Sequence, residues 1–193
     1  LSRAPSSAEA ARAAAALEHW LAQHGGETAA LIVEPLVQCA TGMAMYDPLY
    51  LRRAREICSR HNVHLIADEI AVGFGRTGTL LACEQAGITP DFLCLSKGIT
   101  GGYLPLSVVL TREEVYAAFY DDEIARGFLH SHSYTGNALA CRAALANLAI
   151  FAEDNVIAAN REKSAQITRL AAPLAEDERF GNFRNCGMIW AFD

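Results

Sequence analysis

Short, nearly unbroken apolar runs separated by longer amphipathic segments constrain the fold of this chain most strongly. Three such runs, at residues 29–33, 63–67 and 91–96, have the length and character of buried strands. Residues 6–24 and 48–61 have apolar side chains at helical spacing, and the first of these segments opens with a Ser-x-x-Glu capping pattern. This alternation predicts an α/β fold with a mostly parallel sheet covered by helices on both faces.

The rest of the chain continues the alternation. We expect a further strand at residues 106–110 and a single strand in the tail, at residues 183–192. Segments with helical character are residues 79–86, 112–120, 136–151 and 155–174. Because the chain starts at Leu1 without an initiator methionine or a signal pattern, we expect it to be an internal piece of a longer protein.

The composition is that of a globular protein, with 52% hydrophobic and 20% charged residues. The formal net charge of −6, without a compensating basic run, argues against binding to nucleic acid or to an anionic membrane. No apolar run approaches the ~20 residues that a membrane-spanning helix needs. We therefore expect neither nucleic acid nor a membrane among the partners of this protein.

Six cysteines are scattered along the chain without a C-x-x-C pair and without clustering with histidine. The six histidines show no H-E-x-x-H or other paired spacing. Both patterns argue against a metal site. Scattered cysteines in apolar stretches behave as small hydrophobic residues, so we expect a reducing, cytoplasmic setting.

Charged residues follow directly after the predicted strands. Glu34 follows the first strand, Asp68 the second and Lys97 the third. Because ligands bind at the carboxyl ends of parallel strands, Asp68 and Lys97 can face one pocket. A lysine that is partly desolvated there becomes a nucleophile for a carbonyl group. On spacing alone, however, a surface ion pair between these two residues is the favoured interpretation.

Six motifs in unbroken order, between about residues 29 and 151, overturn that interpretation. They are EP at residues 34–35, LIADEI at 65–70, GFGRTG at 73–78, PDFLCLSK at 90–97, GG at 101–102 and HSHSYTGN at 130–137. In this order they resemble the class III aminotransferases. One of these motifs would be weak support, whereas six in order are strong support.

The resemblance implies a pyridoxal-phosphate (PLP) dependent transferase of fold type I. Residues 1–176 would be part of the PLP-binding large domain, and residues 177–193 would begin a C-terminal small domain. The family also implies a homodimer whose active site is shared across the interface. Its substrates would be a small-molecule amino donor and a keto acceptor.

The family's cofactor residues can be carried over to matching positions of this chain. Lys97 falls where the family has the lysine that holds PLP as a Schiff base, contacts the substrate and moves a proton. Asp68 falls on the carboxylate that keeps the pyridine nitrogen protonated, which makes the ring an electron sink. Ile70 matches the aliphatic residue that packs on the face of the ring.

The loop at residues 130–137 matches the family's segment that crosses the dimer interface to the partner's cofactor phosphate. Ser133 would supply a hydroxyl donor there, with His132 beside it, and Ser131 would touch the substrate. The family usually has threonine at the position of Ser133. The alternative for Ser133 is a helix N-cap near Gly136.

Departures from the common family pattern indicate a subfamily. Ala71 stands where ornithine- and GABA-type members have glutamine, and the surrounding motif is similar to the biotin-pathway members. Cys39 and Thr41 replace glycines that often follow the EP motif. The subfamily acts on 8-amino-7-oxononanoate to form 7,8-diaminononanoate, with S-adenosylmethionine as the usual amino donor.

Three alternatives stay open at this point. The first is a lysine-dependent version of the same step. The second is an omega-amino-acid or diamine:pyruvate transaminase. The third, from a different class, is a truncated scaffold that keeps the fold without catalysis.

Overall fold

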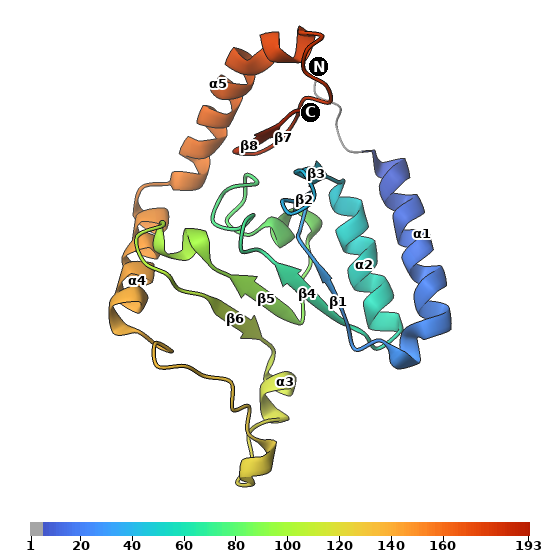
Figure 1. Ribbon diagram of the computed structural model, residues 1–193, viewed down its shortest axis with the longest axis vertical. Helices are drawn as coiled ribbons and strands as arrows, with labels where there is room; N and C mark the ends of the chain where they lie inside the picture. Colours follow the sequence, from blue (N-terminus) through green and yellow to red (C-terminus); the bar gives the residue numbers. More distant parts are fainter. Residues whose placement is uncertain (1–5) are drawn as a thin grey trace.

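The computed structural model describes residues 6–193, arranged around a four-stranded sheet in the order β1-β4-β5-β6 (Figure 1). β1 (Ala30–Val33), β4 (His64–Asp68) and β5 (Phe92–Leu95) are parallel. β6 (Val108–Thr111) runs antiparallel to β5 at one edge. The predicted α/β fold with a mostly parallel sheet is therefore confirmed.

Two helices pack side by side against the sheet near β1 and β4 (Figure 1). α1 (Ser7–His24) and α2 (Pro48–Arg60) each begin at a polar capping residue. Ser6 accepts a hydrogen bond from a backbone N–H of the first turn of α1, and Asp47 does the same for α2. The two helices enclose a core cluster with Leu65 of β4.

Within residues 6–193, helices cover one face of the sheet and not both. Side chains alternate between the two faces along a strand, and Leu65 and Leu93 point into the core. Buried side chains of α1, α2 and α4 (Ala138–Glu153), among them Leu21, Leu51 and Ala144, join clusters on this face. The expectation that both faces are covered was therefore wrong for the described chain.

We call the second face of the sheet the open face. Strand pairing and the alternation of side chains place Ile32, Ile66, Asp68, Cys94 and Val109 among the residues on it. Ile32 and Val109 are each 60% exposed. Exposed apolar side chains that share one face of a sheet suit that face to contact with other groups.

Beyond β6 the chain forms an arm, residues 112–137, that extends from the sheet and returns to α4 (Figure 1). The arm contains α3 (Glu113–Ala117), which is shorter than the predicted helix. A turn follows at Asp121, whose carboxylate accepts hydrogen bonds from the Glu123 N–H and from Arg126. The short 3-10 helix Ile124–Arg126 lies beyond this turn.

The remaining helices agree with the sequence pattern. α4 is followed directly by α5 (Val156–Glu176), and the predicted helix at 79–86 is a 3-10 helix, η2 (Ala82–Ala86). A small hairpin of β2 (Val37–Gln38) and β3 (Ala44–Met45) follows β1. No helix among residues 6–193 has both the length and the apolar character to cross a membrane.

The tail forms a hairpin, so the predicted single strand at residues 183–192 was wrong. β7 (Arg184–Cys186) and β8 (Ile189–Ala191) pair around Gly187, which has a φ of +57°. A Cβ atom on this glycine would lie 2.4 Å from the carbonyl carbon of Thr77. The close approach fixes the hairpin against the turn at residues 73–78 and requires glycine at its tip.

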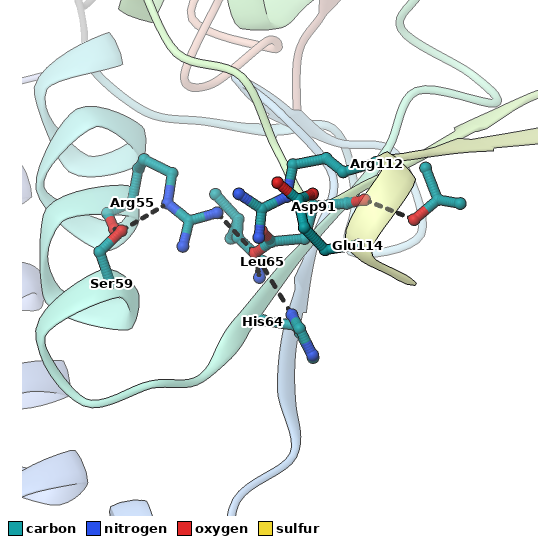
Figure 2. Close-up of polar contacts among 8 residues, drawn as sticks. Arg55, Ser59, His64, Leu65, Asp91, Arg112 and Glu114 are labelled. Carbon is teal, nitrogen blue, oxygen red and sulfur yellow. Dashed lines mark hydrogen bonds and ion pairs between the residues drawn. The ribbon is translucent and has the colours of Figure 1, made fainter. Parts of the chain in front are cut away.

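A buried carboxylate joins the amino ends of the central strands to α2 (Figure 2). The side chain of Asp91, only 3% exposed, accepts hydrogen bonds from the backbone N–H of Leu65 (2.7 Å) and from Arg55 (2.6 Å). Arg112 forms a second ion pair with it (2.8 Å), and His64 lies 3.8 Å away. Asp91 therefore connects α2, β4, β5 and the start of the arm.

Opposing effects act on the pKa of Asp91. Burial alone would raise it, but the hydrogen bonds from Arg55 and the Leu65 N–H and the two guanidinium charges lower it overall. A carboxyl group whose pKa is lower in the folded state stabilises the fold above its unfolded pKa, about 3.9. This stabilisation is lost as the pH falls below that value.

We expect Asp91→Ala to lower the free energy of unfolding of the complete protein by about 3 kcal/mol at pH 7. The substitution leaves a buried N–H group and two guanidinium groups without their acceptor. Urea unfolding measures the loss, which should shrink as the pH falls below about 4. Glu56→Ala, which removes an exposed ion pair with Arg53, is the control and should cost less than about 0.5 kcal/mol. Equal losses for the two variants would contradict a special role for Asp91.

Candidate active site

The carboxyl ends of β4 and β5 bring together the two charged residues singled out by the sequence. Asp68 is the last residue of β4 and pairs in register with Cys94 of β5. Lys97 opens the 3-10 turn η3 (Lys97–Thr100), two residues after β5 ends. Because the strands are parallel and adjacent, both residues lie at the same edge of the sheet.

Asp68 lies half-buried on the open face with one carboxylate oxygen occupied. Its Oδ1 accepts a hydrogen bond from the backbone N–H of Ile70 (3.0 Å). Within residues 6–193 its Oδ2 has no hydrogen-bond partner, and no cation pairs with the carboxylate. Burial raises the pKa of the Cys94 thiol, and the charge of Asp68 raises it further. Because Oδ2 of Asp68 has no partner among these residues, it can accept a hydrogen bond from an external group.

Lys97 has an unusual backbone conformation. Its φ of +42° lies in the left-handed region, which costs a residue other than glycine on the order of 1–3 kcal/mol. Its side chain is exposed and makes no hydrogen bond or ion pair with any described residue. The surface ion pair with Asp68 that spacing alone favoured is thus absent from the described structure. A strained lysine with a free amine indicates a functional position.

The turn that carries Lys97 is held by hydrogen bonds from α4. Asn147 of α4 donates hydrogen bonds from Nδ2 to the carbonyl oxygens of Gly98 (2.8 Å) and Ile99 (3.2 Å). A Cβ atom on Gly98 would lie 2.8 Å from the Cβ of Phe74, so only glycine fits there. We did not identify Asn147 from the sequence. The only available signal was a single amide in an otherwise Ala- and Leu-rich helix.

The turn after Asp68 is fixed by a buried acid. Glu69 is fully buried, and its carboxylate accepts hydrogen bonds from the N–H groups of Ala82 (2.7 Å) and Cys83 (2.8 Å). Burial raises the pKa of Glu69, and these backbone hydrogen bonds oppose that rise. Glu69 therefore positions the segment that carries Asp68 and Ile70 but is not available to a ligand.

The β2–β3 hairpin borders the same edge. Glu34 accepts a hydrogen bond from the backbone N–H of Cys39 (2.7 Å), and the Tyr46 hydroxyl donates to the Glu34 carbonyl (2.7 Å). Burial and the charge of Glu34 raise the pKa of the Cys39 thiol, while the positive charges of Lys97 and Arg76 oppose this rise. The tip of the hairpin therefore lies within the electrostatic reach of Lys97.

Residues 131–133 are exposed near the C-terminal end of the arm. Within residues 6–193 they make no hydrogen bond or ion pair with Asp68 or Lys97. The backbone N–H of Tyr134 donates to Nδ1 of His132 (3.1 Å), which shapes the loop locally. The N-cap of α4 is Asn137, whose Oδ1 accepts from the Ala140 N–H (3.0 Å), so the alternative role of Ser133 as this cap was wrong. The functional roles of Ser131, His132 and Ser133 stay predictions.

Among residues 6–193, no group of three or more histidine, cysteine, aspartate or glutamate side chains is arranged to hold a metal ion. All six cysteines are free thiols. The groups present at this edge of the sheet include the amine of Lys97 and the carboxylate of Asp68.

Comparison with known proteins places the chain in a family. The family model for aminotransferase class-III matches residues 2–193. The chain is 51% identical over 183 residues to an adenosylmethionine-8-amino-7-oxononanoate aminotransferase from Helicobacter pylori, covering 92% of this chain and 42% of the relative. It is 48% identical over 176 residues to the enzyme of that name from Nitratidesulfovibrio vulgaris, covering 90% of this chain and 32% of the relative.

Solved structures agree with this result. The protein of the same name from Methanocaldococcus jannaschii superposes with a TM-score of 0.86 at 36% identity, covering 91% of this chain and 41% of that one. A PLP-bound amine transaminase from an uncultivated Pseudomonas species gives a TM-score of 0.85 at 37% identity, covering 94% and 41%. The chain thus spans about two fifths of the length of the first of these relatives and of both structures. These matches show that the chain belongs to the class III aminotransferase family and has the fold of PLP-dependent aminotransferases of fold type I.

Proposed function

We propose that this protein transfers an amino group to 8-amino-7-oxononanoate to form 7,8-diaminononanoate in biotin synthesis, with PLP as cofactor and S-adenosylmethionine as amino donor. The observation that carries the proposal is the pair of free charged groups, Asp68 and Lys97, at the ends of adjacent parallel strands. The names of the two relatives described above support the choice of substrate and donor.

The residues at this edge fit the cofactor. PLP offers an aldehyde, a basic ring nitrogen and a flat apolar ring. Lys97 has a free exposed amine for the aldehyde, and Asp68 has an unoccupied carboxylate oxygen for a protonated nitrogen. Ile70 follows Asp68 in the same turn and supplies an aliphatic side chain for the ring.

When bound, PLP supplies an electron sink that stabilises negative charge on the amino-bearing carbon of the substrate. Lys97 would hold the cofactor through its amine and, as a base near the reacting carbon of the substrate, would accept and return the proton of that carbon. Asp68 keeps the ring nitrogen protonated, because a carboxylate favours the cationic form of a neighbouring base. Glu69, through its hydrogen bonds from the Ala82 and Cys83 N–H groups, fixes the segment that carries Asp68.

We further propose a cytoplasmic homodimer in which residues 131–133 act at the partner's site, Ser133 and His132 at the cofactor phosphate and Ser131 at the substrate. Exposed apolar side chains on the arm support an interface there, since Ile124 is 81% exposed. The exposed position of the loop on this arm is consistent with a role in trans. We also propose that residues 1–176 belong to the large domain and that residues 177–193 begin the small domain.

A second candidate is a lysine-dependent version of the same step, and a third is an omega-amino-acid or diamine:pyruvate transaminase. The similarity of the fold to that of an amine transaminase supports the third candidate. Both candidates use the same roles for Lys97 and Asp68. A catalytically inactive scaffold would need neither residue.

A donor screen on the complete, cofactor-loaded protein tests the substrate. We expect S-adenosylmethionine to remove the absorption of the lysine-linked cofactor, and 8-amino-7-oxononanoate to restore it. Depletion by lysine alone would indicate the lysine-dependent version. Depletion by beta-alanine with recovery by pyruvate would contradict the proposal in favour of the omega-amino-acid class. The Lys97→Ala variant should show no such absorption, and the absence of any response in the wild type would favour a scaffold.

Replacing the ring-nitrogen carboxylate tests Asp68. We expect Asp68→Asn to lower kcat by about 100-fold or more, because a neutral amide no longer favours a protonated ring nitrogen. Some cofactor should stay bound, since Lys97 is unchanged. Steady-state kinetics of the complete protein give the measurement, and Asp154→Asn, an exposed position at the end of α4, is the control. A kcat within twofold of the wild type at full cofactor occupancy would assign the role to another residue.

A further inference from the structure

The left-handed conformation of Lys97 needs support from its surroundings. Other backbone conformations are more favourable for a lysine, so the turn must be held by contacts that outweigh the strain. The turn itself provides backbone hydrogen bonds from Ile99 N–H to Ser96 and from Gly101 N–H to Gly98. These bonds close the turn but do not attach it to the rest of the protein.

Asn147 provides that attachment. A side-chain amide has two N–H donors, and those of Asn147 meet the carbonyl oxygens of Gly98 and Ile99, the two residues directly after Lys97. Its Oδ1 lies 3.1 Å from the position that a Cβ atom on Gly101 would take. The amide group therefore lies against the part of the turn between Gly98 and Gly101.

Apolar contacts fix the position of Asn147 itself. Ala144, one turn earlier on α4, lies in the core cluster with Ile99. Phe151, one turn later, contacts the ring of Phe74 at a centroid distance of 6.2 Å, and Phe74 packs against Gly98. The helix is thus packed onto the turn on both sides of the amide. Substituting the amide alone should leave these contacts in place.

We propose that Asn147 is a positioning residue that holds the backbone of Lys97 in its left-handed conformation and so directs the amine toward the cofactor. The proposal rests on the proposed function of Lys97. Without the two hydrogen bonds, the carbonyl groups of Gly98 and Ile99 can rotate, and Lys97 can relax to a more favourable conformation. Its amine then spends less time where the cofactor aldehyde binds.

The test uses Asn147→Asp in the complete protein, because aspartate has nearly the same shape but lacks the N–H donors. We expect cofactor-free Asn147→Asp to bind PLP covalently about tenfold more slowly than the wild type. The pH midpoint of the lysine-linked absorption should shift, and kcat should fall about tenfold with KM within twofold. Asn147→Ala, which keeps the helix and adds no charge, should show the same changes if the aspartate variant folds poorly.

Thr168→Val is the matched control, because it removes the acceptor of the hydrogen bond that Trp190 of β8 donates to Thr168 of α5, which does not touch Lys97. It should leave the attachment rate and the pH midpoint unchanged. Attachment rates and midpoints of both Asn147 variants equal to the wild type would overturn the positioning role. Failure of the wild type to bind PLP through Lys97 would instead overturn the proposed function, on which the inference depends.

Discussion

Parallel pairing of β4 with β5 is the interaction on which the rest of the site depends. Hydrogen bonds between these strands set Asp68 opposite Cys94 and bring the turn that follows β5 to the same edge. A shift of the register by one residue would move Asp68 to the buried face and its carboxylate into the core. Asp68 and Lys97 are far apart in the sequence, and the pairing of the two strands brings them to the same edge of the sheet. Glu69 and Asn147, which support the two turns, only refine this arrangement.

The two ends of the central strands have opposite electrostatic character. At the amino end, Asp91 is surrounded by Arg55, Arg112 and a backbone N–H, so its charge is fully compensated. At the carboxyl end, Asp68 and Lys97 have no ionic partners within residues 6–193. A buried charge destabilises the fold when its partners are removed, whereas binding and catalysis need groups that are still free to interact. The same pair of strands thus serves stability at one end and chemistry at the other.

Much of this arrangement could be predicted from the sequence because it depends on local patterns. Apolar runs located β1, β4 and β5, and the residues after them located Asp68 and Lys97. Contacts between distant segments could not be predicted in this way. Asn147 lies far from Lys97 in the sequence, and only the packing of α4 on η3 brings them together. The tail hairpin was missed because the tip glycine, Gly187, is selected by its contact with Thr77. The roles of residues 131–133 depend on a second subunit and stay predictions.

Identification of the lysine that binds the cofactor tests the central claim most directly. The chain contains two lysines, Lys97 and Lys163, and the second is exposed on α5. Borohydride reduction of the complete, PLP-loaded protein makes the cofactor linkage permanent, and peptide mass mapping then locates it. The account predicts a single pyridoxyl label on the peptide that contains Lys97. A label on Lys163, or on a lysine outside this chain with Lys97 unmodified, would contradict it.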